Sequence, residues 1–225
     1  MSNFQVHWEI LPPPQRLLWK SLSPSIDTGF VLYGGTAAAL RLGHRISLDF
    51  DFFSERPLDR QTLNEAFPFL NQSILIQDAP ESLSVLASTA SGSVKVSFFG
   101  QISIGRTGTP ERTPDRVLEV ASLLDLLATK LKVIQQRVEA KDYRDIAAIL
   151  KSGTSLSDGL GAAAAMYGSN FQPSEALKAL ACFEGGDLST LSVDEKKQLS
   201  LSVSKVRHIA PRGIVSRILS ADDCA

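Results

Sequence analysis

Apolar and polar residues alternate with two different periods along the chain, and this change divides it into two parts. In the first part, short apolar runs bounded by Gly, Pro, Asp or Ser are typical of buried β-strands. Strands are expected at residues 30–33, 48–53, 74–76, 83–88 and 93–99. Helices are expected at residues 15–21, 36–42 and 60–66. The first part is therefore predicted to form a sheet with helices, in which the last three strands make a meander.

Beyond residue 114 the apolar residues recur at helical spacing. One face of a first helix carries Leu123, Leu124, Leu127, Leu131 and Ile134. A second helix is expected from about residue 141 to 150, and further helices at 155–167, 174–183 and 192–207. The segment 105–114, which contains Gly and Pro among polar residues, separates the two patterns. We therefore expect an α/β domain over residues 1–114 and a helical domain over residues 115–225.

Composition and length are those of a soluble globular protein. The 225 residues, 44% hydrophobic and 21% charged, are enough for a buried core. No run reaches eighteen apolar residues, and Met1 to Trp8 lacks the features of a secretory signal. Cys182 and Cys224 lie far apart and outside any metal-type spacing, so both are expected to be free thiols. These observations favour a cytoplasmic protein with no membrane partner.

Two segments of the first part carry residues with a clear chemical use. Gly34 and Gly35 follow an apolar strand and lead into a helix, and such a turn presents backbone N–H groups to an anion. Asp49 and Asp51 are two residues apart on the next expected strand, so their carboxylates project from one face. Paired carboxylates suit a magnesium ion that bridges nucleotide phosphates. A phosphate cradle combined with a metal site predicts nucleotidyl transfer.

The helical part carries a second cluster of charged residues. Lys130 and Arg137 are seven residues apart, so on one helix they would share a face about two turns apart. Asp142 and Asp145 are three residues apart and would share a face of the following helix. These four side chains are candidates for contacts with phosphate groups or with one another.

Each pattern also has a purely structural interpretation. A Gly-Gly pair after a strand is typical of an ordinary turn, and the Asp-x-Asp pair could be the solvated face of an edge strand. Arg45 could be a structural ion-pair partner of these carboxylates, with no metal involved. Lys130 could be a solvated helix residue and Arg137 a partner of Asp142. The residue pattern alone leaves both interpretations open.

Four motifs in order carry a resemblance to a known family. They read Leu-Tyr-Gly-Gly-Thr-Ala from residue 32, His-Arg-x-Ser-x-Asp-x-Asp-Phe-Phe from residue 44, Asp-Leu-Leu-Ala-Thr-Lys-Leu from residue 125 and Lys-Asp-Tyr-Arg-Asp-Ile from residue 141. Together they resemble the AbiEii/AbiGii-type nucleotidyltransferase-like toxin family of bacteria. The resemblance implies a DNA polymerase β-like nucleotidyltransferase fold of the α/β (α+β) class, a mixed sheet with helices, followed by a helical bundle.

The resemblance also implies roles for individual residues. The implied catalytic residues are Asp49, Asp51, Lys130 and Asp145, of which the first two would hold Mg²⁺. The implied nucleotide-binding residues are Gly34, Gly35, Thr36, Arg45, Arg137 and Asp142. Magnesium would orient the triphosphate of an NTP, while Lys130 and Arg45 would contact phosphate oxygens.

One position departs from the pattern of polymerase β-like transferases. Many of them place a third carboxylate on a later strand, where it helps to bind the catalytic metal. In the resemblance, Ser97 on the expected strand 93–99 aligns with that position, and serine is a poor metal ligand and no base at neutral pH. Either Asp142 or Asp145 supplies the charge, or the chemistry is slow, or the site binds without reacting.

The leading hypothesis is a magnesium-dependent nucleotidyltransferase that moves a nucleotide from an NTP to an RNA (tRNA-like) or protein acceptor. It would be the toxin of a toxin–antitoxin pair, with a cognate antitoxin as partner, or a relative without a partner. The alternative is a non-catalytic nucleotide- or partner-binding module that kept the fold. The net charge of −1 gives no general basic signal, so RNA binding would need a local patch, for which the candidates are Lys130, Lys132, Arg137 and Lys141.

Overall fold

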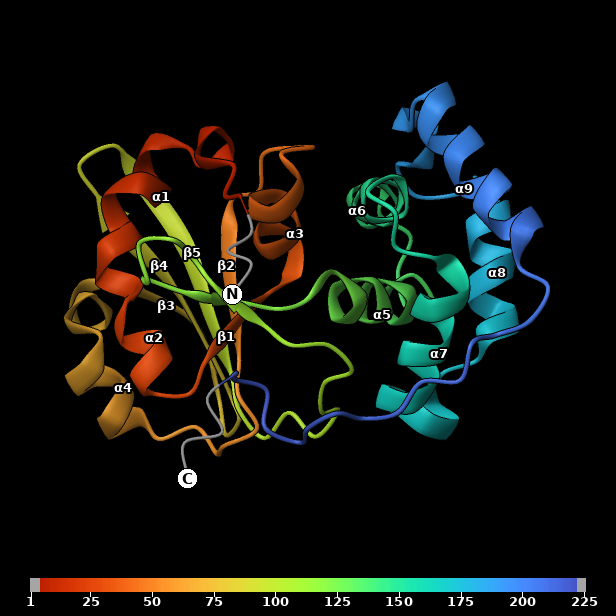
Figure 1. Cartoon of the computed structure of the whole chain (residues 1–225). Helices are drawn as coiled ribbons and strands as arrows, with labels where there is room; N and C mark the ends of the chain where they lie inside the picture. Colours follow the sequence, from red (N-terminus) through yellow and green to blue (C-terminus); the bar gives the residue numbers. More distant parts are fainter. Residues whose placement is uncertain (1–4, 222–225) are drawn as a thin grey trace. The chain divides into compact units, whose positions relative to one another are not determined.

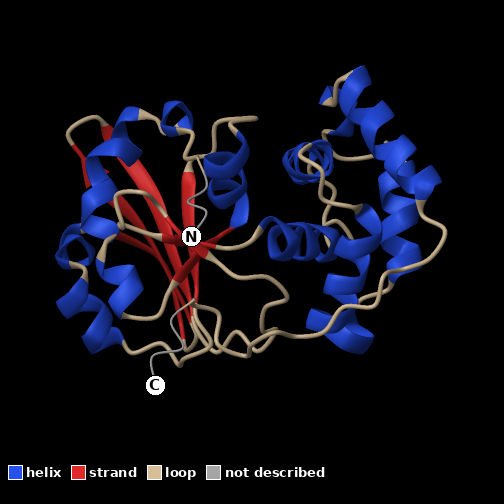
Figure 2. Cartoon of the chain, viewed as in Figure 1, coloured by secondary structure: helices blue, strands red, loops and turns tan. Residues whose placement is uncertain are grey.

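The computed structural model describes residues 5–221, which divide into two compact units (Figure 1). The first unit contains the chain up to Gly105, residues 109–122 and the C-terminal segment from Ser216. The second contains residues 106–108 and 123–215. In the described part of the chain, the strands belong to the first unit and the second unit is helical (Figure 2).

The first unit is built on a mixed sheet whose strand order is β3-β4-β5-β2-β1-β7-β6. The strands are β1 (Val31–Tyr33), β2 (Asp49–Phe53), β3 (Ile74–Ala79), β4 (Ser82–Thr89), β5 (Gly92–Phe99), β6 (Glu111–Arg112) and β7 (Glu119–Val120). The last three expected strands form the antiparallel meander β3-β4-β5, and β5 runs parallel to β2. This mixed α/β architecture confirms the predicted fold class.

Strands β6 and β7 were not predicted from the sequence, because each is only two residues long and has no recognisable alternation of apolar and polar residues. β7 pairs in parallel with β1 through Leu32 and Val120. Residues 115–122 therefore belong to the sheet-containing unit, although the sequence had placed them with the helices beyond residue 114. The long-range pairing with β1 is the physical reason for this difference.

Aromatic residues on one face of the sheet form the core of the first unit. Phe52 stacks on Phe98 with ring centroids 5.4 Å apart, and Trp19 and Phe67 pack on neighbouring rings. The helical elements of this unit are η1 (Trp8–Ile10), α1 (Pro13–Leu18), η2 (Trp19–Leu22), α2 (Pro24–Asp27), α3 (Gly34–Leu42), α4 (Arg60–Ala66) and η3 (Pro68–Gln72). In Figure 1 α3 lies across the sheet from α1, α2 and α4. Different helices therefore cover the two faces of the sheet, with α3 on one face and α1, α2 and α4 on the other.

The second unit is a helical bundle with five α-helices in its described part. The elements are α5 (Leu123–Val133), α6 (Ala140–Lys151), α7 (Leu156–Tyr167), η4 (Gly168–Asn170), α8 (Pro173–Ala181), η5 (Leu188–Thr190) and α9 (Val193–Lys205). Ser155 and Ser192 cap α7 and α9 through their side chains. Helix α5 ends at Val133 and does not continue to Arg137. Consecutive β-branched residues, Val133 and Ile134, lower the helix propensity there.

The chain returns to the first unit after α9. Leu219 is fully buried, and its backbone N–H donates to Glu55 Oε2 at 3.0 Å. The backbone N–H of Ala221 donates to Glu119 Oε2 at 2.9 Å. The segment from Ser216 is therefore part of the sheet-containing unit.

The remaining sequence-based expectations concern the two cysteines, the first residues and membrane spans. Cys182 is an exposed free thiol, as expected, whereas Cys224 and residues 1–4 lie outside the described residues. Within residues 5–221, none of the helices combines the length and the apolar character needed to cross a membrane.

Candidate functional site

The two glycines between β1 and α3 bring the start of the helix close to the carboxylate strand. Gly34 has a φ of +72°, a conformation that favours glycine, and a Cβ on it would lie 2.6 Å from Asp51 Oδ2. A Cβ on Gly35 would lie 2.9 Å from Ser47 Oγ and would also overlap the Arg45 guanidinium. Both glycines are therefore required by close approach, and they set Asp51 and Arg45 beside the N-terminal end of α3.

Asp49 and Asp51 project together from one face of β2. Both are half-buried, whereas the alternating residues Phe50 and Phe52 are fully buried on the opposite face. The Asp49 carboxylate makes no hydrogen bond or ion pair with other residues in the range 5–221. A half-buried carboxylate without a protein partner, next to a second carboxylate on the same face, suits a divalent cation bound through oxygen. The described residues contain no group of three or more His, Cys, Asp or Glu side chains arranged to hold a metal.

The strand that carries these carboxylates lies inside the sheet. β2 is flanked by β1 on one side and β5 on the other. The interpretation of Asp49 and Asp51 as the solvated face of an edge strand is therefore wrong. Asp51 is in register with Tyr33 of β1 and with Ser97 of β5, and Asp49 is in register with Lys95 of β5.

Thr36 connects α3 to the same strand. Its side chain is buried, and its hydroxyl donates a hydrogen bond to the backbone carbonyl oxygen of Asp49. Arg45, in the segment that leads into β2, donates from Nη1 to the carbonyl oxygen of Ile46 at 3.0 Å. These bonds hold the helix start and the carboxylate strand in one arrangement. The predicted residues 34–36, 45, 49 and 51 are thus brought together in the first unit.

Ser97 lies next to Asp51 and is fully buried. The Ser84 hydroxyl donates to Ser97 Oγ at 3.0 Å, from the neighbouring strand β4. Since residues in register on adjacent strands project on the same face, the position beside Asp51 carries a hydroxyl that is already paired inside the sheet. It contributes no negative charge to the carboxylate face.

The second predicted cluster comes together between α5 and α6. Lys130 Nζ lies 2.7 Å from Asp142 Oδ1 and 2.7 Å from Asp145 Oδ2. Arg137 Nε lies 2.9 Å from Asp142 Oδ2, although Arg137 sits beyond the end of α5. Both carboxylates are fully buried. The interpretation of Lys130 as a solvated helix residue is wrong, and Arg137 is indeed a partner of Asp142.

The charges within this cluster balance one another. Burial raises the pKa of Asp142, but the positive charge of Lys130 and the hydrogen bond from Arg137 outweigh it, so the pKa lies below its ordinary value. Asp142 is therefore ionised at neutral pH. Lys130 Nζ donates to Asp142 Oδ1 and forms an ion pair with Asp145, so one cation serves both buried carboxylates.

The other two cations of the expected basic patch also have partners. Lys141 Nζ lies 2.7 Å from Glu139 Oε2, and Lys132 Nζ donates to the carbonyl oxygen of Asn170. Lys130, Arg137 and Lys141 are paired with acids, whereas the partner of Lys132 is a neutral carbonyl, so most of the charge of the expected basic patch is compensated.

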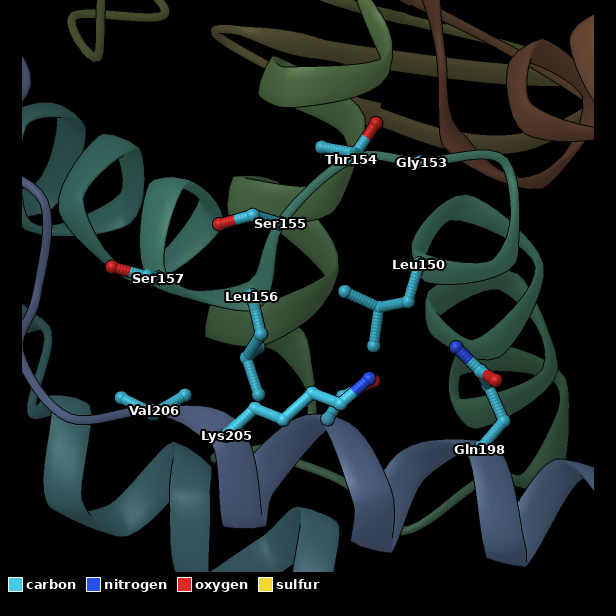
Figure 3. A pocket seen from close by; sticks show the side chains of 10 residues that line it. Leu150, Gly153, Thr154, Ser155, Leu156, Ser157, Gln198, Lys205 and Val206 are labelled. Atoms are coloured by element: carbon cyan, nitrogen blue, oxygen red, sulfur yellow. The ribbon is translucent and has the colours of Figure 1, made fainter.

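A separate pocket of about 240 Å³ lies within the second unit (Figure 3). It is bordered by the end of α6, the start of α7 and one side of α9, and Figure 3 shows Leu150, Leu156 and Gln198 around it. None of the residues predicted from the motifs lines this pocket. The pocket is therefore distinct from the carboxylate face of β2 and from the Lys130 cluster.

A mixed sheet with a glycine turn, a helix and two carboxylates on the following central strand defines a nucleotidyltransferase-like fold. Two solved structures share this fold. One is an antigenic nucleotidyltransferase-like protein from Paracoccidioides brasiliensis, with a TM-score of 0.53, 18% identity and coverage of 85% of this chain and 92% of that one. The other is MenT4, a nucleotidyltransferase toxin from Mycobacterium tuberculosis, with a TM-score of 0.52, 14% identity and coverage of 83% and 81%.

The family model described as "Nucleotidyl transferase AbiEii toxin, Type IV TA system" matches residues 16–197. The chain belongs to this family, which confirms the resemblance found in the four motifs. An uncharacterised protein of Aquifex aeolicus (strain VF5) is 32% identical over 131 residues. That match covers 57% of this chain and 61% of the relative's length.

Proposed function

We propose that this protein transfers a nucleotide from an NTP to an RNA or protein acceptor in a magnesium-dependent reaction. The observation that carries the proposal is the close approach of the glycine turn to the carboxylate strand. Gly34 leaves space for Asp51, and Asp49 on the same face has no protein partner among the residues described. Backbone N–H groups at the start of α3 can bind phosphate next to two carboxylates that can bind a metal.

The residues of the first unit have distinct roles in this reaction. Magnesium held by Asp49 and Asp51 would offset negative charge on the phosphates. The first N–H groups of α3 and the Arg45 guanidinium bind phosphate oxygens, and Thr36 fixes the helix start through its bond to the Asp49 backbone. The acceptor oxygen forms a bond to the α-phosphorus while the bond to the bridging oxygen breaks. Pyrophosphate leaves with that electron pair, and the proton of the acceptor hydroxyl passes to water.

The family model supports a further part of the proposal, which concerns biological context. We propose that the protein acts in the cytoplasm as the toxin of a toxin–antitoxin pair and that a cognate antitoxin is its partner. The description of the family as toxins of a type IV toxin–antitoxin system supports this proposal. Induced expression in bacteria should arrest growth, and expression of the Asp49→Ala/Asp51→Ala variant should not.

Catalytic roles for Lys130 and Asp145, and nucleotide contacts for Arg137 and Asp142, remain predictions from the family resemblance. The ion pairs within this cluster support a role in holding α6 against α5. The balanced charge of the cluster offers little support for a general RNA-binding surface on the second unit. Both acceptor classes are therefore included in the assay.

The test is a transfer assay with purified protein. The protein is incubated with each of the four radiolabelled NTPs, magnesium and total bacterial RNA, and in parallel with a bacterial protein extract. We expect label to enter one acceptor fraction with the intact chain and not with the Asp49→Ala/Asp51→Ala control. Transfer that continues undiminished in the control would contradict the assigned site.

The alternative is a non-catalytic module that binds nucleotides without transferring them. The observation that favours it is that the residue in register with Asp51 on β5 is Ser97, a buried hydroxyl and not a carboxylate. This alternative predicts magnesium-dependent NTP binding that requires Asp49 and Asp51, with no label in any acceptor fraction.

A further inference from the structure

Lys95 lies directly beside Asp49 on the carboxylate face of the sheet. β5 runs parallel to β2, with Lys95 in register with Asp49 and Ser97 in register with Asp51. Residues in register on neighbouring strands project from the same face, with backbones about 4.8 Å apart. On the β5 side, the two positions next to the carboxylate pair are therefore occupied by an ammonium group and a neutral hydroxyl.

The Lys95 ammonium is available to a ligand. The side chain is half-buried, and within residues 5–221 it makes no hydrogen bond or ion pair. The Asp49 carboxylate opposite it is also without a partner in that range. Opposite charges at directly opposed positions usually stabilise a sheet by pairing. Here both groups remain free, which is the arrangement expected when a ligand carrying phosphate and a cation fits between them.

A second cation lies on the other side of the carboxylate strand. The Arg45 guanidinium lies over Gly35, next to the end of β1, whereas Lys95 belongs to β5. Because β2 lies between β1 and β5, the two cations flank Asp49 and Asp51 from opposite sides. A triphosphate placed along this face would meet positive charge at both ends.

We propose that Lys95 binds the triphosphate of the substrate and takes the place of a second metal ion. This inference rests on the proposed function. Two divalent cations on three carboxylates leave one net positive charge, and one divalent cation with one lysine on two carboxylates leaves the same net charge. Because Ser97, in register with Asp51, is neutral, the positive charge of Lys95 gives the site the same net charge as a second metal ion with a third carboxylate would. The site therefore holds one divalent cation per chain, and Lys95 donates to a phosphate oxygen.

The first experiment measures binding without turnover. The probes are the α,β-methylene analogues of the four NTPs, which cannot be cleaved between those phosphates, titrated by calorimetry with magnesium. We expect Lys95→Ala to weaken the analogue that binds the intact chain by about tenfold or more, because a hydrogen bond between charged groups is lost. Lys95→Arg should stay within about threefold because it keeps the charge. Lys20→Ala, which removes an exposed lysine of η2 in the same unit, should bind like the intact chain.

The second experiment counts metal ions. Mn²⁺ binding followed by electron paramagnetic resonance in the presence of the analogue should give one ion per chain in the intact protein and in Lys95→Ala. Two ions per chain in the intact protein, or unchanged analogue affinity in a folded Lys95→Ala, would overturn the proposal for Lys95. If the intact chain binds none of the analogues, or if Asp49→Asn binds as well as the intact chain, the proposed function fails and the role of Lys95 fails with it.

Discussion

At the residue scale, position 34 combines a backbone requirement with a chemical one. The φ of +72° favours glycine, and the absent Cβ makes space for Asp51. We expect Gly34→Ala to lower the free energy of unfolding by about 1 kcal/mol or more and to abolish magnesium-dependent triphosphate binding, because the methyl group displaces the carboxylate. Urea unfolding and calorimetric titration would measure the two effects.

Gly153 is the matched control for this substitution. It also has a positive φ, of +109°, but a Cβ there would meet no heavy atom within 4 Å. Gly153→Ala should therefore lose stability through backbone strain and bind the triphosphate like the intact chain. Equal binding by the two variants would contradict the assigned contact between Gly34 and Asp51.

The residue pattern identified the glycine turn and the Asp-x-Asp pair because both depend on neighbours within a few positions. Lys95 did not emerge from the sequence, because a lysine within an apolar strand has no local feature that marks it. Its place beside Asp49 depends on the register between β2 and β5, which are separated in sequence by more than a helix and two strands.

At the element scale, the Lys130 cluster joins α5 to α6 through buried charges. We expect Lys130→Met to lower the free energy of unfolding by about 3 kcal/mol or more, because two buried carboxylates lose their common cation. Urea unfolding at pH 7 measures the change. Lys178→Met removes an exposed partner of Glu175 on α8 and should change stability by less than about 1 kcal/mol. Similar losses in both variants would contradict the importance of the buried cluster.

The same cluster predicts a pH dependence. The folded-state pKa of Asp142 lies below its ordinary value of 3.8, so the unfolded chain takes up the proton first as pH falls. The contribution of this carboxylate to stability is complete above the unfolded pKa and is lost as pH falls through the folded pKa. We expect the stability difference between the intact chain and Asp142→Asn to be largest near pH 7 and to shrink below about pH 4. A difference that grows on acidification would contradict this account.

Helix positions followed well from the sequence, and helix ends less well. The starts of α4, α7 and α9 lie close to the predicted ones, because the side chains of Asp59, Ser155 and Ser192 accept hydrogen bonds from backbone N–H groups of the helix that each precedes. In the first turn of α5, the Asp125 carboxylate accepts hydrogen bonds from the backbone N–H and the hydroxyl of Thr107, each at 2.7 Å. This contact joins the start of α5 to a residue 18 positions earlier in the chain, which local sequence rules do not predict.

At the scale of the whole molecule, the chain passes from the first unit to the second and back. Leu219 is fully buried in the first unit, whereas Ile218 is 39% exposed. We expect Leu219→Ala to lower the free energy of unfolding by about 2 to 4 kcal/mol and to speed hydrogen exchange in β1 and β7. Ile218→Ala should have a much smaller effect on both measurements. Faster exchange confined to α5–α9 in Leu219→Ala would contradict the assignment of this segment to the first unit.

The sequence by itself determined the α/β class, most elements, the two carboxylates, the glycine turn and the family, because each depends on short-range periodicity or on local motifs. Only the tertiary structure decided the strand order, the place of Ser97 and Lys95 beside the carboxylates, the balanced Lys130 cluster and the return of the C-terminal segment. These features depend on contacts between residues far apart in the chain, and such contacts leave no periodic pattern in the residues that make them.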